Sequence, residues 1–124
     1  MTRYLAPLAT AAFAALALSQ APAAAAPAAA HDGRWSVEVV TQRGDCDRAY
    51  RYAILIENGQ ARYGSSDFEV KGRVQPTGAV QASISRGADR ADVVGRLTDG
   101  QGSGTWTTSG AKACGGVWNA ERRG

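Results

Sequence analysis

Histidine is nearly absent from this sequence, and its absence limits the chemistry that the protein can perform. The single histidine, His31, precedes every segment with a strand pattern. Serine and cysteine nucleophiles need a neighbouring base, so neither a serine nor a cysteine triad can be assembled from the rest of the chain. One histidine and two cysteines are also too few for the tetrahedral ligand set of zinc. We therefore expect neither an enzyme nor a metal or other cofactor.

Blocks of charge of one sign are also missing. Lys and Arg number 14 and Asp and Glu number 11, and the two signs alternate along the chain. Such alternation is typical of a solvated surface, whereas nucleic-acid binding needs a concentrated stripe of cations. A phosphate-binding glycine loop should open a helix, but Gly100–Gly104 falls between two strand segments, where we expect a flexible hairpin. We expect no nucleic-acid partner.

No apolar run reaches the length of a bilayer. The longest, Leu5–Leu18, is interrupted by Pro7 and is shorter than the ~20 residues that a spanning helix needs. Arg3 precedes this run and a stretch rich in Ala and Pro follows it, as in a secretory signal. We predict a signal and Ala/Pro-rich segment over residues 1–30 and one domain over residues 31–124. The processed protein is then extracytoplasmic, either periplasmic or secreted, without a membrane anchor.

The cysteine count predicts a cross-link in this small domain. Cys46 and Cys114 are the only cysteines, and an even number in an exported chain of this size predicts a disulfide. Closing so long a loop restricts the unfolded chain by about 4 kcal/mol. The alternatives are two free thiols or a metal-binding pair.

From Trp35 onward, apolar and polar residues alternate with a period of two, which predicts an all-β domain of short strands. In Phe68–Val74, apolar residues and a glycine alternate with charged residues, so one face of the strand meets the core and the other meets water. Asn58-Gly59 fits a two-residue hairpin turn, because both central positions need positive φ. We predict eight strands, over residues 35–39, 50–57, 60–64, 68–74, 80–84, 91–97, 102–107 and 115–120.

The positions of the cysteines indicate how these strands are arranged. If successive strands run up and down, the loops that contain Cys46 and Cys114 lie at the same end of the domain. The first and last strands become neighbours only where the sheet curls into a barrel, and closure also removes the exposed edges. We therefore predict a small up-and-down antiparallel eight-stranded barrel with one disulfide across its seam. A β-sandwich is the alternative.

Alternation also predicts the contents of the barrel. Three tryptophans face inward, together with glycines 72, 95, 104 and 116, which offer space for neighbouring indoles. A barrel of this size is just wide enough for side chains to fill it or for one small ligand. We expect the side chains to fill it. A ligand cavity would instead be lined by Trp35, Tyr52, Trp106 and Trp118.

The motif Gly-x-Trp occurs three times, at residues 33–35, 104–106 and 116–118. At the first strand it resembles the signature of the lipocalin and avidin-like barrels. This resemblance implies a tryptophan that plugs one end of the barrel and a function as a carrier of a small apolar ligand. The ligand could be haem-like, because strand tyrosines such as Tyr52 can supply a tyrosinate to the iron.

Two further resemblances concern the whole architecture. A signal-bearing, disulfide-linked barrel of this size is similar to the periplasmic inhibitors of secreted metalloproteases. This similarity implies a protease inhibitor that inserts the tail around residues 31–33 into the protease cleft. The chain also resembles an uncharacterised class of small secreted proteobacterial β-barrel proteins.

We predict that the barrel is a non-enzymatic module that recognises a protein or cell-envelope partner through its surface. Loops carry function more often than the strands that hold them, and the longest loops gather at the end that carries the disulfide, here called the disulfide rim. Asp45 and Asp47 should form ion pairs with neighbouring arginines. The carrier and the inhibitor are the alternatives. The predicted binding rim consists of Arg43, Asp45, Asp47, Arg48, Ser65, Ser66, Asp67 and Lys112.

Overall fold

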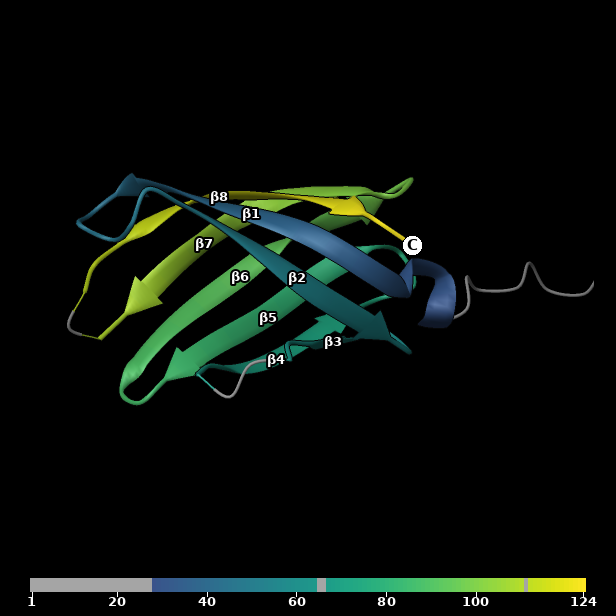
Figure 1. Ribbon diagram of the computed structural model, residues 1–124, viewed down its shortest axis with the longest axis horizontal. Helices are drawn as coiled ribbons and strands as arrows, with labels where there is room; N and C mark the ends of the chain where they lie inside the picture. The colour runs from purple at the N-terminus through teal and green to yellow at the C-terminus, as the bar shows by residue number, and fades with distance from the viewer. Residues whose placement is uncertain (1–27, 65–66, 111) are drawn as a thin grey trace, which may run out of the picture.

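The computed structural model describes residues 28–64, 67–110 and 112–124, which form a closed antiparallel barrel (Figure 1). Each strand pairs with the next along the chain, and β8 pairs with β1. This order confirms the up-and-down barrel and excludes the sandwich. The elements are the 3₁₀ helix η1 (Ala28–His31) and the strands β1 (Gly33–Arg43), β2 (Ala49–Glu57), β3 (Gln60–Arg62), β4 (Glu69–Val74), β5 (Ala79–Arg86), β6 (Asp89–Thr98), β7 (Gln101–Ser109) and β8 (Gly115–Arg122).

The predicted signal segment lies outside the described residues, apart from its last part at 28–30. Among the residues that are described, no helix is both long and apolar enough to span a membrane.

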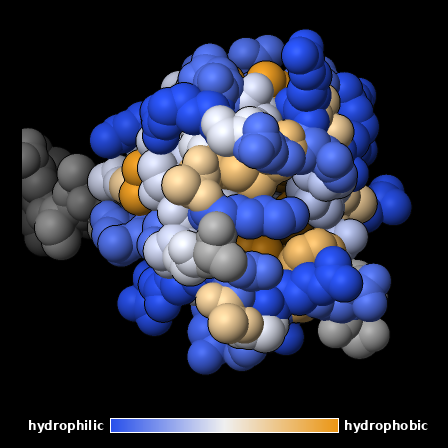
Figure 2. All heavy atoms as spheres, turned by 90° about the vertical axis from the view of Figure 1, so that its left-hand side faces the viewer, coloured by the Kyte–Doolittle hydropathy of each residue, from blue (hydrophilic) through white to orange (hydrophobic). Residues whose placement is uncertain are grey.

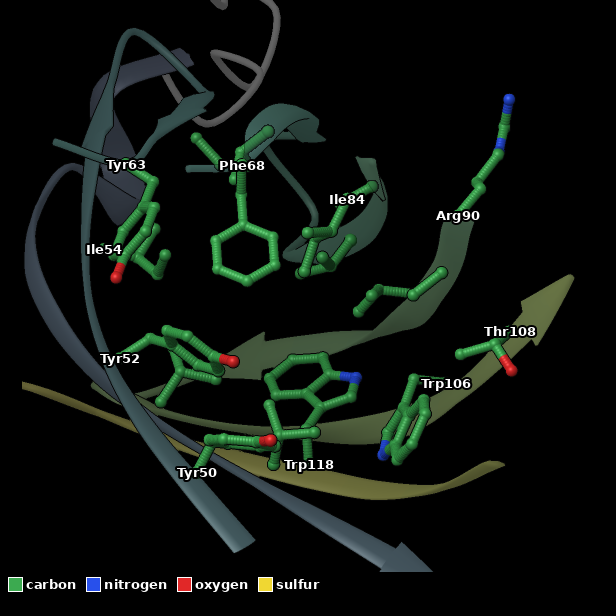
Figure 3. Close-up of a pocket in the computed structure, with 18 of the residues that line it drawn as sticks. Tyr50, Tyr52, Ile54, Tyr63, Phe68, Ile84, Arg90, Trp106, Thr108 and Trp118 are labelled. Atoms are coloured by element: carbon green, nitrogen blue, oxygen red, sulfur yellow. The ribbon is translucent and has the colours of Figure 1, made fainter. Parts of the chain in front are cut away.

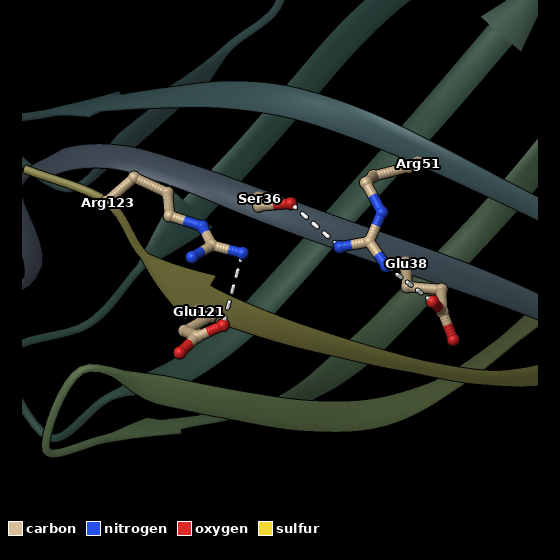
Figure 4. Close-up of polar contacts among 5 residues, drawn as sticks. All are labelled: Ser36, Glu38, Arg51, Glu121 and Arg123. Carbon is tan, nitrogen blue, oxygen red and sulfur yellow. Dashed lines mark hydrogen bonds and ion pairs between the residues drawn. The ribbon is translucent and has the colours of Figure 1, made fainter.

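The backbone ladder of β1 closes the barrel. Val39 on β1 lies opposite Tyr50 on β2 and opposite Trp118 on β8, so β1 is hydrogen-bonded along both of its edges. On the outer face, polar contacts accompany this seam (Figure 4). Arg51 forms an ion pair with Glu38 at 2.8 Å. Exposed pairs of this kind contribute about 0–1 kcal/mol, so the ladder and the core account for closure.

Arg51 also donates a hydrogen bond to the hydroxyl of Ser36 at 3.2 Å. Near the end of β8, Arg123 pairs with Glu121 at 3.3 Å. The outer face of the seam is therefore polar, as the alternation of the sequence predicts.

Two short turns depend on residues that accept positive φ. Asn58 and Gly59, with φ of 50° and 74°, connect β2 to β3 and confirm the predicted hairpin turn. Asp99 and Gly100, with φ of 54° and 78°, form the equivalent turn between β6 and β7. The expected flexible hairpin over Gly100–Gly104 is wrong beyond this turn. Its later residues belong to β7 and pair with both neighbouring strands.

The disulfide confirms the predicted pairing of the two cysteines. Cys46 follows β1 and Cys114 precedes β8, and their Cα atoms lie 6.1 Å apart. The side chain of Thr108 holds the second loop in place, because its hydroxyl donates to the carbonyl of Lys112 at 2.6 Å and accepts from the amide of Cys114 at 2.7 Å. The cross-link thus joins the first and last strands at one end of the barrel.

The opposite end of the barrel is closed by a buried core. Trp35 is its largest side chain and is 2% exposed. The indole Nε1 of Trp35 donates to the carbonyl of His31 in η1 at 2.9 Å, and the guanidinium of Arg122 lies 5.1 Å from the centre of the ring. The other buried apolar residues near this end are Ile56, Val74, Leu97 and Ala120.

The residue after η1 ties the N-terminal segment to the same end. The carboxylate of Asp32 accepts hydrogen bonds from the backbone amides of Asn58 at 2.6 Å and Gly59 at 3.1 Å. The ring of His31 lies 3.1 Å from the carbonyl of Pro76. Residues 31–33 are therefore part of the closed end, beside the C-terminus (Figure 1).

Candidate ligand cavity

Trp118 lies against the barrel wall and leaves the centre of the barrel open. Gly104 on the adjacent strand β7 and Gly95 on β6 face its indole, and a Cβ at these glycines would come within 2.6 Å and 2.4 Å of ring atoms, respectively. The indole thus occupies the space that side chains at these positions would need. Its Nε1 donates to the carbonyl of Val94 at 3.0 Å, which holds the ring at the wall.

The other two tryptophans are also held at the boundary of the barrel. The indole Nε1 of Trp106 lies 3.1 Å from the carbonyl of Val40 and 3.2 Å from that of Val117, between β1 and β8. Trp35 is fixed at the closed end. The expectation that side chains fill the interior is therefore wrong. Of the four glycines predicted to make room for an indole, Gly95 and Gly104 face that of Trp118, whereas Gly72 faces two alanines and Gly116 faces the backbone of β1.

The wall opposite Trp118 contains a cluster of three small residues. Ala61, Gly72 and Ala82 lie side by side on β3, β4 and β5, and a Cβ at Gly72 would come within 2.9 Å and 3.0 Å of the two alanine methyl carbons. Ala91 lies nearer the mouth on β6, opposite Ile84, and also lines the cavity. These side chains are too short to reach the axis of the barrel, so they leave its centre empty.

The result is a cavity of about 600 Å³ that opens at the disulfide rim. Its lining is chiefly apolar and includes all four of the residues predicted for a ligand cavity, Trp35, Tyr52, Trp106 and Trp118. Figure 2 shows this end of the molecule, where hydrophobic atoms are visible in a hollow surrounded by hydrophilic side chains. The cavity runs from this mouth toward Trp35 at the closed end.

Four aromatic side chains form a continuous row near the mouth. The aromatic row consists of Tyr50, Tyr52, Tyr63 and Phe68, with consecutive ring centres 5.8, 5.7 and 6.4 Å apart. Such distances are typical of interacting aromatic pairs. At the end of the row, the guanidinium of Arg86 lies 5.6 Å from the ring centre of Phe68. Figure 3 shows these rings around the same space as the indole of Trp118.

Two tyrosines of the row, Tyr50 and Tyr52, hold their protons at neutral pH. Tyr50 donates a hydrogen bond to the carboxylate of Asp47, and this bond, with a smaller contribution from burial, raises the pKa of Tyr50 from 10.0 to about 12. Burial raises the pKa of Tyr52, with smaller contributions from Tyr63 and Asp47. Both phenols are therefore neutral hydrogen-bond donors at neutral pH.

Charged side chains line the cavity only at its mouth, and their signs balance. Three acids and three bases are present, and the rest of the lining is uncharged. Arg90 is paired with Asp92 at 2.9 Å, and Arg86 lies over Phe68. The charged residues at the mouth are Asp45, Asp47, Arg86, Asp89, Arg90 and Lys112.

The predicted binding rim coincides with this mouth only in part. Asp45, Asp47 and Lys112 line it. Three other predicted rim residues, Arg43, Arg48 and Asp67, are exposed at the same end but do not line the cavity. The last two, Ser65 and Ser66, lie outside the described residues.

The expected ion pairs of Asp45 and Asp47 with arginines are wrong. In the described part of the chain neither carboxylate takes part in an ion pair, and Asp47 accepts from Tyr50 instead. The loop is held by the disulfide and by the hydroxyl of Thr41, which donates to the carbonyl of Asp47 at 2.6 Å.

Sequence reasoning missed two groups of residues at the mouth. The first is the hairpin between β5 and β6, which contributes Arg86, Asp89 and Arg90. In an up-and-down barrel this hairpin lies at the same end as the disulfide, so counting strands could have found it. The second is the rest of the aromatic row beside the predicted Tyr52, namely Tyr50, Tyr63 and Phe68, for which the two-residue spacing of Tyr50 and Tyr52 was the available signal.

No known protein family, curated protein or solved structure matches the chain. Within the described ranges, no group of three or more His, Cys, Asp or Glu side chains is placed to hold a metal ion. The chemistry of the cavity itself is therefore the basis for a function.

Proposed function

We propose that the protein binds a small, largely apolar molecule inside the barrel and carries it outside the cytoplasm. The observation that supports this proposal is the cavity, because an apolar space of about 600 Å³ lies within the range of about 300–1,000 Å³ found for small-molecule sites. Its lining combines many apolar side chains with a few polar groups at the mouth, as such sites usually do.

The driving force for this binding is the burial of apolar surface. Each Å² of apolar ligand surface that leaves water contributes about 25 cal/mol. The wall is preformed, since Trp118 is held by Val94 and the tryptophans at 35 and 106 are also hydrogen-bonded. Little side-chain order must therefore be gained on binding, which lowers its entropic cost.

The extracytoplasmic location is part of the proposal. A disulfide persists in oxidising compartments and is rare in the cytosol, and the Cys46–Cys114 bond fits the secretory signal predicted over residues 1–30.

The contacts of the N-terminal segment favour the carrier over a protease inhibitor. In an inhibitor, residues 31–33 would enter a protease cleft. Here Asp32 binds the turn at Asn58 and Gly59, and His31 supplies the carbonyl that Trp35 binds. Insertion into a protease would therefore open the closed end of the barrel. Recognition of a protein partner at the disulfide rim stays a prediction, and it is compatible with a ligand that enters at the same place.

Native mass spectrometry of the processed protein, purified from its own exported fraction, tests the proposal. We expect a bound small molecule on the wild type. Ala82→Phe places a ring into the cavity from the cluster of small residues and should abolish retention of the bound molecule. Gln81→Phe, at the preceding and exposed position of β5, should leave that retention unchanged. Circular dichroism checks that both variants fold. A wild type without ligand, or equal retention by both variants, would contradict the proposal.

A further inference from the structure

The half of the cavity near the mouth differs in character from the half near the closed end. Toward the closed end the lining is aliphatic apart from Trp35, with Ile54 beside Trp35 and Val80 beside Val74. Toward the mouth it is dominated by the aromatic row, whose four rings follow one another along the wall. The two halves therefore suit different parts of a ligand.

The aromatic row and Trp118 lie around one space. Figure 3 shows the rings of Tyr52 and Phe68 and the indole of Trp118 directed toward the same opening. Trp118 is fixed by its hydrogen bond to Val94, and Phe68 is covered by Arg86. Aromatic rings interact through stacked or edge-to-face contacts with other rings, in addition to the burial of their surface. A flat ring compound would make such contacts on both sides, whereas a saturated chain would make none of them.

The electrostatics of the mouth favour an uncharged molecule. The acids and bases that line it balance, and no charged side chain lines the interior. A buried charge on the ligand would therefore lose its hydration without gaining a partner. The phenol of Tyr52 keeps its proton and can donate a hydrogen bond into the cavity. A hydroxyl or carbonyl oxygen on the ligand would accept it.

We propose that the cavity takes a flat, uncharged polycyclic aromatic compound that carries a hydroxyl or carbonyl group, with its rings between the aromatic row and Trp118. This inference rests on the proposed function, because it names the class of ligand for the same cavity.

Displacement of a fluorescent probe tests the ligand class. N-phenylnaphthylamine, whose emission rises in an apolar site, is first titrated into the oxidised protein. It is then displaced by phenanthrol or by tetradecanol, two alcohols with the same number of carbon atoms, of which one is flat and aromatic and the other is a saturated chain. We expect phenanthrol to bind at least about tenfold more tightly, which corresponds to the gain of more than one ring contact.

Variants of the row separate ring contacts from simple burial. Phe68→Leu compared with the wild type, and Tyr52→Leu compared with Tyr52→Phe, each remove a ring while keeping an apolar side chain, and each should weaken phenanthrol about two- to tenfold with little change for tetradecanol. Tyr52→Phe keeps the ring and removes only the hydrogen-bond donor, so it should weaken both alcohols alike, by about two- to tenfold. Leu55→Ala is the matched control, because Leu55 lies on the exposed face of the same strand.

The outcomes distinguish failure of the ligand class from failure of the carrier function. Equal affinities for the two alcohols, or equal weakening of both by the leucine variants, would overturn the aromatic class and leave the carrier intact. Absence of saturable binding by the probe and by both alcohols would overturn both proposals. If the leucine variants do not fold, the comparison of the two alcohols on the wild type decides the matter.

Discussion

Replacement of Gly95 by alanine tests whether a glycine pair keeps Trp118 at the barrel wall. A Cβ at this position would lie 2.2 Å from the carbonyl oxygen of Ser103, 2.4 Å from Cζ2 of Trp118 and 2.8 Å from Cα of Gly104. Two of these atoms belong to the backbone of β7, and the third belongs to a ring that is hydrogen-bonded to Val94. The methyl group must therefore spread the ladder between β6 and β7 and push the indole toward the cavity.

The expected loss of stability follows from these two displacements. Overpacking of a filled site costs about 1–3 kcal/mol, and loss of the hydrogen bond between Trp118 and Val94 costs about 1 kcal/mol more. We expect Gly95→Ala to lower the free energy of unfolding by about 2–4 kcal/mol, a large share of the ~5–15 kcal/mol that holds a typical domain. The displaced indole should also reduce the space for a ligand.

Urea unfolding, followed by circular dichroism, measures the free energy of unfolding, and tryptophan emission reports the new environment of the indole. Gly64→Ala is the control, because a Cβ at Gly64 would meet no atom within 4 Å. A loss below about 0.5 kcal/mol for Gly95→Ala, within the range of ordinary surface substitutions, would refute the view that this glycine makes room for Trp118. Unchanged emission would refute it as well.

Three further predictions concern the cross-link, the rim and the closed end. Removal of the disulfide by Cys46→Ser with Cys114→Ser should lower the free energy of unfolding by about 4 kcal/mol; equal urea midpoints with and without the bond would argue against this. The folded-state pKa of Tyr50 lies at about 12, above its ordinary 10.0, so the stabilisation from its protonated form is complete below pH 10.0 and is lost as the pH rises toward 12. In urea titrations over this pH range, Tyr50→Phe should therefore lose less stability than the wild type. Parallel losses in both proteins would exclude a role for the hydrogen bond between Tyr50 and Asp47. Asp32→Ala leaves two backbone amides of a turn without their acceptor and should lower the free energy of unfolding by about 1–2 kcal/mol. Thermal unfolding measures this loss. A variant that melts at the same temperature as the wild type would count against the proposed closure.

Features that depend on local pattern were predictable from the sequence. Alternation from Trp35 onward predicted the strands and their inward faces, and Asn58-Gly59 predicted a turn that needs positive φ. The cysteine positions favoured closure of the barrel, because a seam between the first and last strands brings Cys46 and Cys114 together, but they left the sandwich as an alternative.

The open centre of the barrel was not predictable, because alternation says that a side chain points inward but not where it then lies. Trp118 turns toward β6 and β7 because Gly95 and Gly104, both distant in sequence from it, make room there. The small wall around Gly72 likewise arises from three strands whose registers must be known first. Whether an inward tryptophan fills the space or lines it depends on these neighbours.

The candidate site was predictable in position but not in composition. Loop length drew attention to Asp45, Asp47 and Lys112, which do line the mouth. The short hairpin that carries Arg86 and Arg90 was overlooked because only loop length was weighed. Loop length is a poor guide in a barrel, where every second connection reaches the same end.

A crystal structure of the oxidised protein soaked with bromonaphthol measures most directly whether the barrel holds an accessible apolar site. The anomalous signal of bromine locates the flat ring independently of the protein. We predict a single strong peak inside the barrel, between Trp118 and Phe68, with the ring entering from the disulfide rim. A centre filled by side chains, or a peak found only on the outer surface, would contradict the account.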